Sequence, residues 1–274
     1  MVTVVKVGGG DGVDPGRVCG DVAELAAAGE PVALVHGGAA EIDRLAAQLG
    51  LARRTLVSPA GTTSRHNDPA TLDALTMAMT GRVKPRLLAA LAARGVPAAG
   101  MTGLDAGLLV ARRKGAQRAV VDGRTVVVRD DLSGRIVAVD PTLPRLLLEH
   151  GIVPVVSPPA AGEDGRPLNV DADRAAAALA AALGAGRLVL LTGAPGVIGD
   201  GDVAMARLQL PAEGPVELGW SGGMRRKLHA ARDALAGGVP QVVVGDGRVE
   251  HPLAAALAGR GTTVTLAGGP AVPG

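Results

Sequence analysis

Val-Thr-Val-Val-Lys-Val-Gly-Gly-Gly occupies residues 2–10, and this stretch decides the fold of the chain. The run Val2–Val7 is short, largely apolar and β-branched, which predicts a strand buried on both faces of a sheet. Lys6 is the only charged residue in that run. Three glycines follow at once, at the carboxyl end of the strand, where α/β proteins bind their ligands. The stretch therefore predicts a central strand with a ligand-binding turn at its end.

Short apolar runs of the same kind recur along the whole chain. They predict strands at Val2–Val7, Val32–Val35, Ile152–Val156, Leu188–Leu191, Val242–Val244 and Thr262–Leu266. Segments with helical periodicity lie between them and predict helices at Pro15–Ala28, Ala39–Leu49, Pro69–Ala93, Pro141–His150, Ala172–Leu183, Met224–Ala236 and Pro252–Ala258. Strands that alternate with helices predict an α/β protein, with a mostly parallel sheet and helices on both of its faces.

Residues 107–139 interrupt this alternation. Their strand-like runs are Leu108–Ala111, Ala119–Val121 and Val126–Val128. Asp122-Gly123, between the last two runs, is the two-residue signal of a β-hairpin. We therefore predict a β-hairpin that extends from the main sheet. Residues 160–167 are rich in glycine, proline and charged residues, which predicts a loop before the next helix and a lobe boundary near it.

The composition is that of a globular protein with an unusual core. Hydrophobic residues make up 47% of the chain and charged residues 20%. Phe and Tyr are absent and Trp220 is the only aromatic residue, so alanine, valine and leucine have to fill the core. Small aliphatic side chains suit the packing of helices on a parallel sheet.

Charge, cysteine content and hydropathy exclude several classes of protein. The net charge is only +2, and side chains on which bases could stack are lacking, so we expect no binding to nucleic acid. The single Cys19 excludes an internal disulfide. No apolar run reaches ~18 residues and no signal peptide is visible, so we expect no membrane association and a cytoplasmic location.

Glycine-rich turns follow several of the predicted strands or open helices. They are Gly8–Gly10, His36-Gly37-Gly38, Thr192-Gly193-Ala194-Pro195-Gly196, Gly222-Gly223-Met224 and Gly245-Asp246-Gly247. Glycine lets main-chain N–H groups approach an anion closely, and a helix N-terminus adds its dipole. One such turn can simply be a tight turn, but several at one edge of a sheet favour a polyphosphate ligand. The chain has neither the P-loop pattern nor the dinucleotide-binding pattern.

Lysine is scarce, because only Lys6, Lys84, Lys114 and Lys227 accompany 24 arginines. Phosphoryl transfer needs positive charge around the moving phosphoryl group, and a carboxylate acceptor needs no general base because it is already ionised. Lys6 and Lys227, each beside a glycine turn, are our candidates for that charge. Asp171 or Asp173 could hold both ammonium groups, although either could instead be a helix N-cap. We expect Lys84 and Lys114 to be exposed to solvent.

These motifs together resemble the amino acid kinase family over nearly the whole chain. The matching residues, in family order, are Lys6-x-Gly8-Gly9, His36-Gly37-Gly38, Asn169-x-x-x-Asp173, Thr192-x-x-Pro195-Gly196 and Gly222-Gly223-Met224-x-x-Lys227. The resemblance implies an open α/β/α sandwich. It implies an N-terminal lobe, residues 1–168, for the acyl substrate, a C-terminal lobe, residues 169–266, for ATP, and a disordered tail at 267–274.

The resemblance also implies the roles of individual residues. Lys6 and Lys227 would stabilise the transition state, and Asp173 would organise them. Substrate contacts would come from Gly37, Gly38, Arg65 and Asn169. The ATP site would be formed by Gly8, Gly9, Thr192, Gly193, Pro195, Gly196, Gly222, Gly223 and Met224. The phosphates, rather than a protein cage, would hold Mg²⁺. Family members are often homodimers.

Two kinds of acceptor compete within the family. One is free N-acetylglutamate, and the other is 2-aminoadipate attached to a small acidic amino-group carrier protein; carrier-bound glutamate or a specialised amino acid are variants of the second. Asn169-Val170-Asp171-Ala172-Asp173, Ser64-Arg65 and Gly103-Leu104-Asp105 resemble the carrier-dependent kinases. A non-catalytic nucleotide-binding regulator is an alternative from another class, but the presence of both lysines and Asp173 argues against it.

A basic window supports the carrier-dependent interpretation. Residues 112–129 contain Arg112, Arg113, Lys114, Arg118, Arg124 and Arg129 against the single acid Asp122, which gives a net charge of +5. A free amino acid does not need such a patch, whereas an acidic protein would be steered by it. We therefore predict that Arg112, Arg113, Lys114 and Arg118 dock the carrier.

The chain departs from the family pattern at a few positions. Ala39 stands where many members have a small glycine or serine. Gly193 replaces an acidic or amide residue, which leaves one nucleotide contact in doubt. His66-Asn67-Asp68 is unlike the usual sequence after the substrate arginine.

Overall fold

The computed structural model describes residues 1–10, 12–58, 63–121, 124–199, 203–214, 216, 220 and 222–268. Its helices are α1 Pro15–Ala27, α2 Ala39–Gln48, α3 Pro69–Ala78, α4 Lys84–Ala92, α5 Thr142–Glu149, α6 Ala172–Leu183, α7 Gly222–Ala236 and α8 Pro252–Leu257. Its strands are β1 Thr3–Val7, β2 Val32–His36, β3 Thr55–Val57, β4 Thr63–Arg65, β5 Ala98–Gly103, β6 Leu109–Arg113, β7 Gln117–Val121, β8 Arg124–Val128, β9 Gly134–Val139, β10 Val153–Gly162, β11 Pro167–Leu168, β12 Arg187–Thr192, β13 Arg207–Leu210, β14 Gln241–Asp246 and β15 Thr262–Leu266. None of the helices described is long and apolar enough to cross a membrane.

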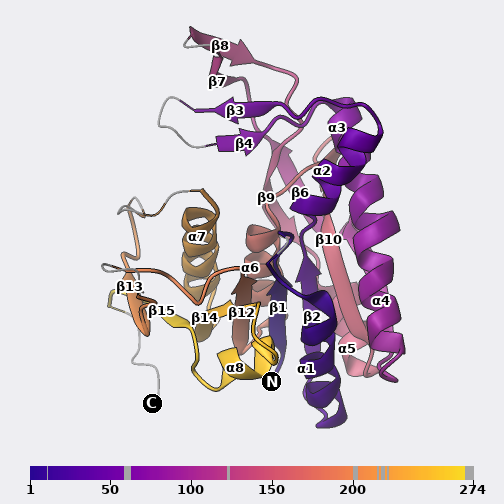
Figure 1. Ribbon diagram of the computed structural model, residues 1–274, viewed down its shortest axis with the longest axis vertical. Coiled ribbons are helices and arrows are strands. Elements are labelled where there is room, and N and C mark those ends of the chain that lie inside the picture. The colour runs from indigo at the N-terminus through magenta and orange to yellow at the C-terminus, as the bar shows by residue number, and fades with distance from the viewer. Residues whose placement is uncertain are drawn as a thin grey trace.

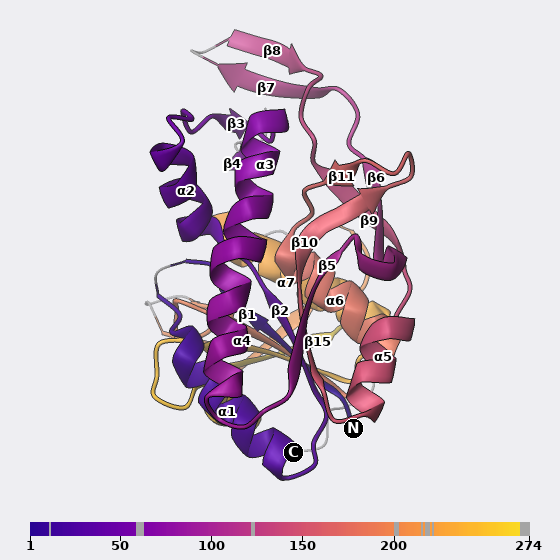
Figure 2. The ribbon, with the colours of Figure 1, turned by 90° about the vertical axis from the view of Figure 1, so that its right-hand side faces the viewer.

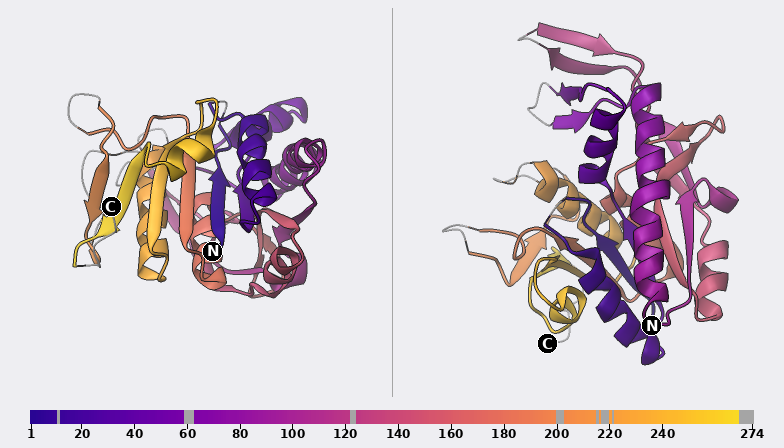
Figure 3. Two further views of the ribbon diagram at one scale, coloured as in Figure 1. Left: turned by 90° about the horizontal axis from the view of Figure 1, so that it is seen from below. Right: turned by 45° about the vertical axis from the view of Figure 1, so that its right-hand side comes forward.

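Within the described residues, eleven strands form the main sheet in the order β13-β15-β14-β12-β1-β2-β10-β6-β9, with β5 and β11 also paired to β10. The central strands from β14 to β6 pair in parallel, while β15 against β14 and β9 against β6 are antiparallel. Strands β13 to β15 form one edge of the sheet (Figures 1 and 3). The mostly parallel α/β sheet predicted from the sequence is therefore confirmed.

Helices cover both faces of this sheet (Figure 2). Val5 and Val7 belong to the core on the side of α1, α4 and α8, whereas Val4 belongs to the core on the side of α6 and α7. Side chains alternate between the faces of a strand, so Lys6 lies on the same side as Val4 and points towards α6 and α7. The register of β1 thus decides which helices can supply partners for Lys6.

The core is built without Phe or Tyr, as the composition predicts. The largest fully buried side chains are leucines, and most of the buried residues of α6 are alanines. Small side chains let α6 pack closely on α7 and on β1. Trp220 is partly buried and donates its indole N–H to the carbonyl of Ile198.

A second, four-stranded sheet in the order β4-β3-β7-β8 stands at one end of the molecule, beyond α2 and α3 (Figures 1 and 2). Strands β7 and β8 are antiparallel neighbours, which confirms the predicted β-hairpin excursion. The predicted turn, Asp122-Gly123, lies outside the described residues. Of the predicted tail, Ala267 and Gly268 are described and residues 269–274 are not.

The predicted loop at residues 160–167 is wrong in part. Strand β10 continues to Gly162, where Ala161 and Gly162 pair with β6, and β11 then returns antiparallel to β10. Glycine and proline suggested a break here, but pairing on both sides of β10 keeps the chain extended. The apolar runs also gave no signal for the strands β3, β4, β5, β9 and β13.

The predicted helix Pro69–Ala93 is continuous but not uniform. Between α3 and α4 lies a π-helical turn at Met79–Val83. Thr76 and Thr80 each donate their hydroxyl to the carbonyl four residues earlier, which competes with the regular helical ladder.

The prediction that Lys84 is exposed is wrong. Lys84 begins α4, is only 5% exposed, and donates its ammonium group to the carbonyl of Met101 in β5. Burial lowers its pKa to about 8, against the opposing attraction of Asp105. Lys84 also approaches Gly100, where a Cβ would lie 2.8 Å from the Lys84 Cδ. Lys114 is exposed, as predicted.

Replacing Lys84 with methionine is expected to alter how stability depends on pH. The ordinary lysine pKa of 10.5 is lowered in the folded protein, so the unfolded chain binds more protons between pH 8 and 10.5. Stability of the native protein should therefore rise with pH in that window, by up to about 3 kcal/mol. Urea unfolding at pH 7.5 and pH 10 should show this rise in the native protein and a smaller one in Lys84→Met. An equal rise in both proteins would contradict the burial of a charged Lys84.

Candidate functional site

Asp173 joins the two lysines that the sequence singled out. Lys6 Nζ lies 2.8 Å from Asp173 Oδ1, and Lys227 Nζ lies 3.1 Å from Oδ1 and 3.0 Å from Oδ2. Lys6 comes from β1, Asp173 from the first turn of α6, and Lys227 from the second turn of α7. The exposed fractions are 5%, 5% and 8%, so three charges are buried together.

The pKa shifts follow from this arrangement. Burial opposes ionisation of Asp173, but Lys6 and Lys227 outweigh it and lower the pKa of Asp173 to about 2. Burial also opposes the charge of Lys6, but attraction to Asp173 raises the pKa of Lys6. For Lys227, burial and repulsion from Lys6 outweigh Asp173 and lower its pKa. When all three groups are ionised, the cluster carries one net positive charge.

Asp171 and Asp173 have separate roles. Asp171 is the N-cap of α6 and accepts hydrogen bonds from the main-chain N–H groups of Asp173 and Arg174, at 2.9 and 3.1 Å. Its other oxygen lies 3.4 Å from Nε of Arg226. The N-cap alternative therefore holds for Asp171, which leaves the carboxylate of Asp173 to the lysines.

The glycine turn after β1 packs directly against the turn after β2. A Cβ on Gly9 would lie 2.4 Å from the nitrogen of Gly38, and the carbonyl of Gly9 accepts from the N–H of Ala40. Gly37 is close to the start of α6, since its Cβ would lie 3.8 Å from the Cβ of Ala172. The turns after β1 and β2 and the N-terminus of α6 therefore meet at one edge of the sheet.

The turns after β12 and β14 lie at the same edge. A Cβ on Gly8 would lie 3.1 Å from the carbonyl oxygen of Leu191, at the end of β12. The N–H of Gly247 donates to the carbonyl of Thr192, at 2.7 Å. Gly193 faces Gly12, where an added Cβ would be 3.1 Å from the Cα of Gly193. The predicted convergence of glycine turns is thus present in the structure.

Gly196 and the start of α7 contribute further predicted nucleotide residues. Gly196 has a φ of +153°, and a Cβ there would meet the Thr262 hydroxyl at 2.7 Å. Gly222 has a φ of +55° and opens α7 together with Gly223 and Met224, one turn before Lys227. Their spacing places the N-terminus of α7 next to the buried cations.

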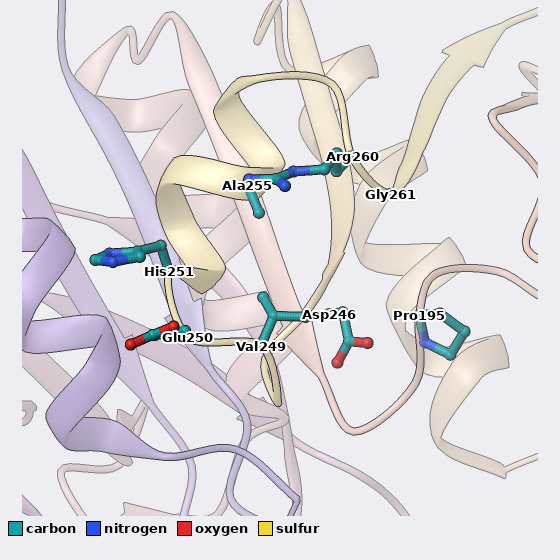
Figure 4. A pocket seen from close by; sticks show the side chains of 8 residues that line it. All are labelled: Pro195, Asp246, Val249, Glu250, His251, Ala255, Arg260 and Gly261. Carbon is teal, nitrogen blue, oxygen red and sulfur yellow. The ribbon is translucent and has the colours of Figure 1, made fainter.

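A pocket of about 390 Å³ lies beside this edge, between the end of β14 and the start of α8 (Figure 4). Its lining comprises Pro195, Asp246, Val249, Glu250, His251, Ala255, Arg260 and Gly261. Pro195 is the only predicted nucleotide residue in the lining, and Lys6, Asp173 and Lys227 are not part of it.

The predicted substrate residues lie around the turn after β2 and the segment before α6. The guanidinium of Arg65, at the end of β4, lies 2.7 Å from Asp43 Oδ1 and donates to the carbonyl of Ala39 at 3.4 Å. Ala39 begins α2, directly after Gly37 and Gly38. Asn169 precedes α6 and donates its side-chain N–H to Asn67 Oδ1 at 3.2 Å. Arg65 is thus brought to the Gly37-Gly38 turn.

Acidic residues near the cations are already engaged. Asp173 is shared by two lysines, Asp171 caps α6, and Asp246 pairs with Arg248 at 2.8 Å. Among the described residues, the one group with metal-ligand spacing is Asp21, Glu24 and His251, on α1 and the turn before α8. There, Asp21 already accepts N–H groups from Leu253 and Ala254 at the start of α8.

The predicted docking residues differ in their contacts. Arg112 forms a two-fold ion pair with Glu163, with both N–O distances at 2.9 Å. Arg113 donates to the main-chain carbonyls of Asp131 and Arg129. Lys114 and Arg118 are exposed, and their side chains make no hydrogen bond or ion pair within the described ranges. The positive charge that remains available on the hairpin is therefore smaller than the sequence count.

Three polar residues next to this site were not predicted. Asp43 pairs with Arg65, and Asn67 and Asp131 lie between Arg65 and Asn169. The Asp43–Arg65 and Asn67–Asp131 contacts join segments far apart in the chain, so no local pattern predicts them. Only Asn67 carried a signal, as part of the unusual run His66-Asn67-Asp68.

Buried cations beside glycine turns, at the carboxyl edge of a parallel sheet, define a site for phosphoryl transfer between anions. The sequence model of the amino acid kinase family matches residues 1–246, and the chain belongs to this family. It is accordingly a kinase, as the motifs predict.

Individual relatives agree with this assignment. The [LysW]-aminoadipate kinase of Deinococcus radiodurans is 44% identical over 266 residues, covering 96% of this chain and 91% of the relative. The acetylglutamate kinase of Acidothermus cellulolyticus is 40% identical over 260 residues, covering 91% and 84%. Among solved structures, N-acetylglutamate synthase from Neisseria gonorrhoeae superposes with a TM-score of 0.74 at 26% identity, over 97% of this chain and 59% of that chain.

Exchanging Gly9 for alanine should damage the site where the same change at Gly10 does not. The methyl group added at position 9 would press on the main chain of Gly37-Gly38, whereas nothing lies within 4 Å of a Cβ on Gly10. Overpacking against main chain costs about 1–3 kcal/mol, and the two turns would have to separate. Urea unfolding and steady-state kinetics of Gly9→Ala should show lower stability and lower kcat, with Gly10→Ala close to the native protein. Equal behaviour of the two variants would contradict the close approach of the turns.

Proposed function

We propose that this kinase transfers the γ-phosphoryl group of ATP to the side-chain carboxylate of 2-aminoadipate held on a small acidic amino-group carrier protein. The product is an acyl phosphate. The observation that carries the proposal is the buried cluster of Lys6, Asp173 and Lys227 beside the converging glycine turns. The ammonium nitrogens of both lysines lie 2.8 to 3.1 Å from the carboxylate oxygens of Asp173. The acceptor is supported by the relatives named [LysW]-aminoadipate kinase and by the basic hairpin.

The chemistry rests on positioning and charge. The acceptor carboxylate is ionised at neutral pH, so the site needs no general base. As the phosphoryl group moves, negative charge spreads over its oxygens, and the ammonium groups of Lys6 and Lys227 offset that charge. Asp173 holds both lysines in place before the substrates bind, so little reorganisation is needed during the reaction.

The C-terminal lobe, residues 169–266, is our proposed site for MgATP. The main-chain N–H group of Gly193 and the N-terminus of α7 at Gly222–Met224 suit its phosphates, together with the N–H groups of Gly8 and Gly9 from the N-terminal lobe. The nearby carboxylates Asp171, Asp173 and Asp246 are engaged in cap and ion-pair contacts. We therefore assign Mg²⁺ mainly to the phosphates, where it would neutralise part of their charge.

The N-terminal lobe, residues 1–168, is our proposed site for the acyl acceptor. We also propose that the enzyme works in the cytoplasm. Arg65 and the N–H group of Gly38 suit a carboxylate of the acceptor, because Arg65 lies beside the start of α2. Gly37, whose N–H donates to the carbonyl of Val7, holds this turn against the end of β1. Asn169 suits its amide. The same groups also suit free N-acetylglutamate, which is the second candidate acceptor because an acetylglutamate kinase is 40% identical.

The exposed face of the hairpin is the proposed dock for the carrier. Lys114 and Arg118 supply positive charge that no described residue pairs with, and Val126 and Val127 on the edge strand β8 are 39% and 48% exposed. An acidic protein would be steered by the charge and would cover the apolar strand. Arg112 and Arg113 contribute less free charge because of their contacts to Glu163 and to the main chain.

The acceptor is tested by measuring ADP release from ATP and Mg²⁺ with each candidate. We expect turnover with carrier-bound 2-aminoadipate and a much lower kcat/KM with free N-acetylglutamate. Lys6→Ala and Lys227→Ala should each lower kcat ~100-fold or more, because each removes a cation that acts in the transition state. Arg187→Ala, at the amino end of β12, is the control and should match the native protein. Efficient use of free N-acetylglutamate with no use of the carrier would reject the proposed acceptor.

The dock is tested by reversing charge on the hairpin. Lys114→Glu/Arg118→Glu should raise KM for the carrier-bound acceptor and weaken its salt dependence, because steering by the patch is lost. KM for ATP should not change. Arg94→Glu/Arg207→Glu makes the same change in net charge on exposed residues just after α4 and at the start of β13, and serves as the control. A similar KM for the carrier in both double variants would argue against the hairpin as the dock.

A further inference from the structure

Asn67 and Asp131 form a buried polar pair that the proposed reaction does not use directly. Asn67 lies between β4 and α3 and is 2% exposed, and Asp131 lies between β8 and β9 and is 4% exposed. A buried polar group is costly unless its hydrogen bonds are made, so a buried pair of this kind fixes geometry around it. Its neighbours are the proposed substrate residues Arg65 and Asn169.

Asp131 is the starting point of the network because an ionised carboxylate can only accept hydrogen bonds. Its Oδ1 accepts from the main-chain N–H of Asn67 at 2.8 Å, and its Oδ2 accepts from the Gln117 side chain at 2.8 Å. Gln117 begins β7, so Asp131 also ties the base of the hairpin to the segment that follows Arg65.

The orientation of the Asn67 carboxamide follows from its surroundings. Its Nδ2 donates to the carbonyl of Arg65 at 3.0 Å and to Ser133 Oγ at 2.9 Å, and Asp131 Oδ1 lies at 3.5 Å from the same nitrogen. Turned end for end, the amide would place its oxygen against a carbonyl oxygen and a carboxylate. Asn67 is therefore held with its nitrogen towards these acceptors and its oxygen towards Asn169.

Asn169 takes its own orientation from Asn67. Asn67 Oδ1 can only accept, so Asn169 presents its Nδ2 to it, at 3.2 Å. The main chain of Asn169 is fixed on both sides by Leu132 and Gly134, with hydrogen bonds of 2.9 and 2.8 Å. The side-chain oxygen of Asn169 is consequently turned away from Asn67 and is left as an acceptor.

We infer that Asn67 and Asp131 are positioning residues for the acyl acceptor. Asp131 sets the direction of Asn67, and Asn67 in turn sets Asn169 as an acceptor for an amide N–H while it fixes the main chain at Arg65. This inference rests on the proposed function only in that Arg65 and Asn169 touch the acceptor. The network of Asn67, Asp131 and Asn169 selects acceptors whose α-nitrogen is part of an amide and carries a hydrogen that can be donated to Asn169.

The neighbouring pair His66 and Asp130 provides a matched control. His66 Nε2 lies 3.0 Å from Asp130 Oδ1, so this pair joins the same two segments one residue away. The contact is at the surface, since the Asp130 side chain is 64% exposed, and it does not involve the carboxamides of Asn67 and Asn169. Losing the His66–Asp130 contact therefore loosens the same connection without changing the direction of Asn67.

The test compares steady-state kinetics of Asn67→Ala, Asp131→Ala and Asp130→Ala on whichever acceptor the native enzyme uses. We expect the first two to raise KM for the acceptor roughly tenfold, because a buried donor or acceptor near the site loses its partner. KM for ATP should stay within about twofold for all three, and Asp130→Ala should leave both KM values near native. Asp131→Asn should recover most of the loss, since Gln117 can turn its carboxamide to accept the new N–H.

These measurements separate positioning from folding. A smaller folded fraction lowers apparent kcat but does not change KM of the molecules that remain folded, and urea unfolding reports stability independently. Asn67→Ser removes the carboxamide without adding charge beside Asp131, and it should also raise KM, which decides the matter where Asn67→Ala does not fold. In an Asn169→Ala background, the effect of Asn67→Ala should shrink, because the two residues act as a unit.

Two results would overturn the inference. One is an acceptor KM in Asn67→Ala and Asp131→Ala no higher than in Asp130→Ala, and the other is an effect confined to kcat or to KM for ATP. Failure of the proposed acceptor appears instead in the native enzyme, as no turnover of the carrier-bound substrate. The two failures are therefore distinguishable.

Discussion

A single carboxylate between two ammonium groups is the contact on which the site depends. Burying Lys6 or Lys227 alone would cost several kcal/mol, and burying both without Asp173 would add their mutual repulsion. The cluster can form only if β1, α6 and α7 meet, and the sheet order β12-β1-β2 with α6 and α7 on one face achieves this. Since Asp173 carries one charge against two, a net positive charge remains where anions are to be bound.

The glycine turns favour a phosphoryl group at this site because they surround the buried positive charge. Turns after β1, β2, β12 and β14 converge at the same edge, and the contact of Gly9 with Gly38 leaves no room for a side chain. Main-chain N–H groups and a helix N-terminus favour anions of any kind. The buried lysines supply what those groups lack, which is full charge directed at one place. Together they account for a site that handles a phosphoryl group between two anionic partners.

Much of the fold and the centre of the site could be predicted from the sequence because their signals are local. Apolar runs of a few residues gave the central strands of the main sheet, although not β5, β9 and β13. Glycine turns beside lysines gave Lys6 and Lys227, whereas the choice of Asp173 over Asp171 came from the resemblance. Lys84 could not be placed in this way, because its burial depends on a carbonyl of β5 and on the missing side chain of Gly100. Arg65 was named by resemblance, but its partner Asp43 comes from another segment. The Asn67–Asp131 contact likewise spans the hairpin, and no periodicity reports it.

The two halves of the site are attached to the protein in different ways. The cations are fixed by ion pairs among core elements of the main sheet, so a change there disturbs both charge and packing. The groups proposed to bind the acceptor depend on single, directional hydrogen bonds that link α2, the small sheet and the segment before α6. Such bonds are worth little net energy but are strict about direction, since a donor cannot replace an acceptor. Acceptor recognition can therefore be altered through residues such as Asn67 and Asp131 while the chemistry at Lys6 and Lys227 is kept.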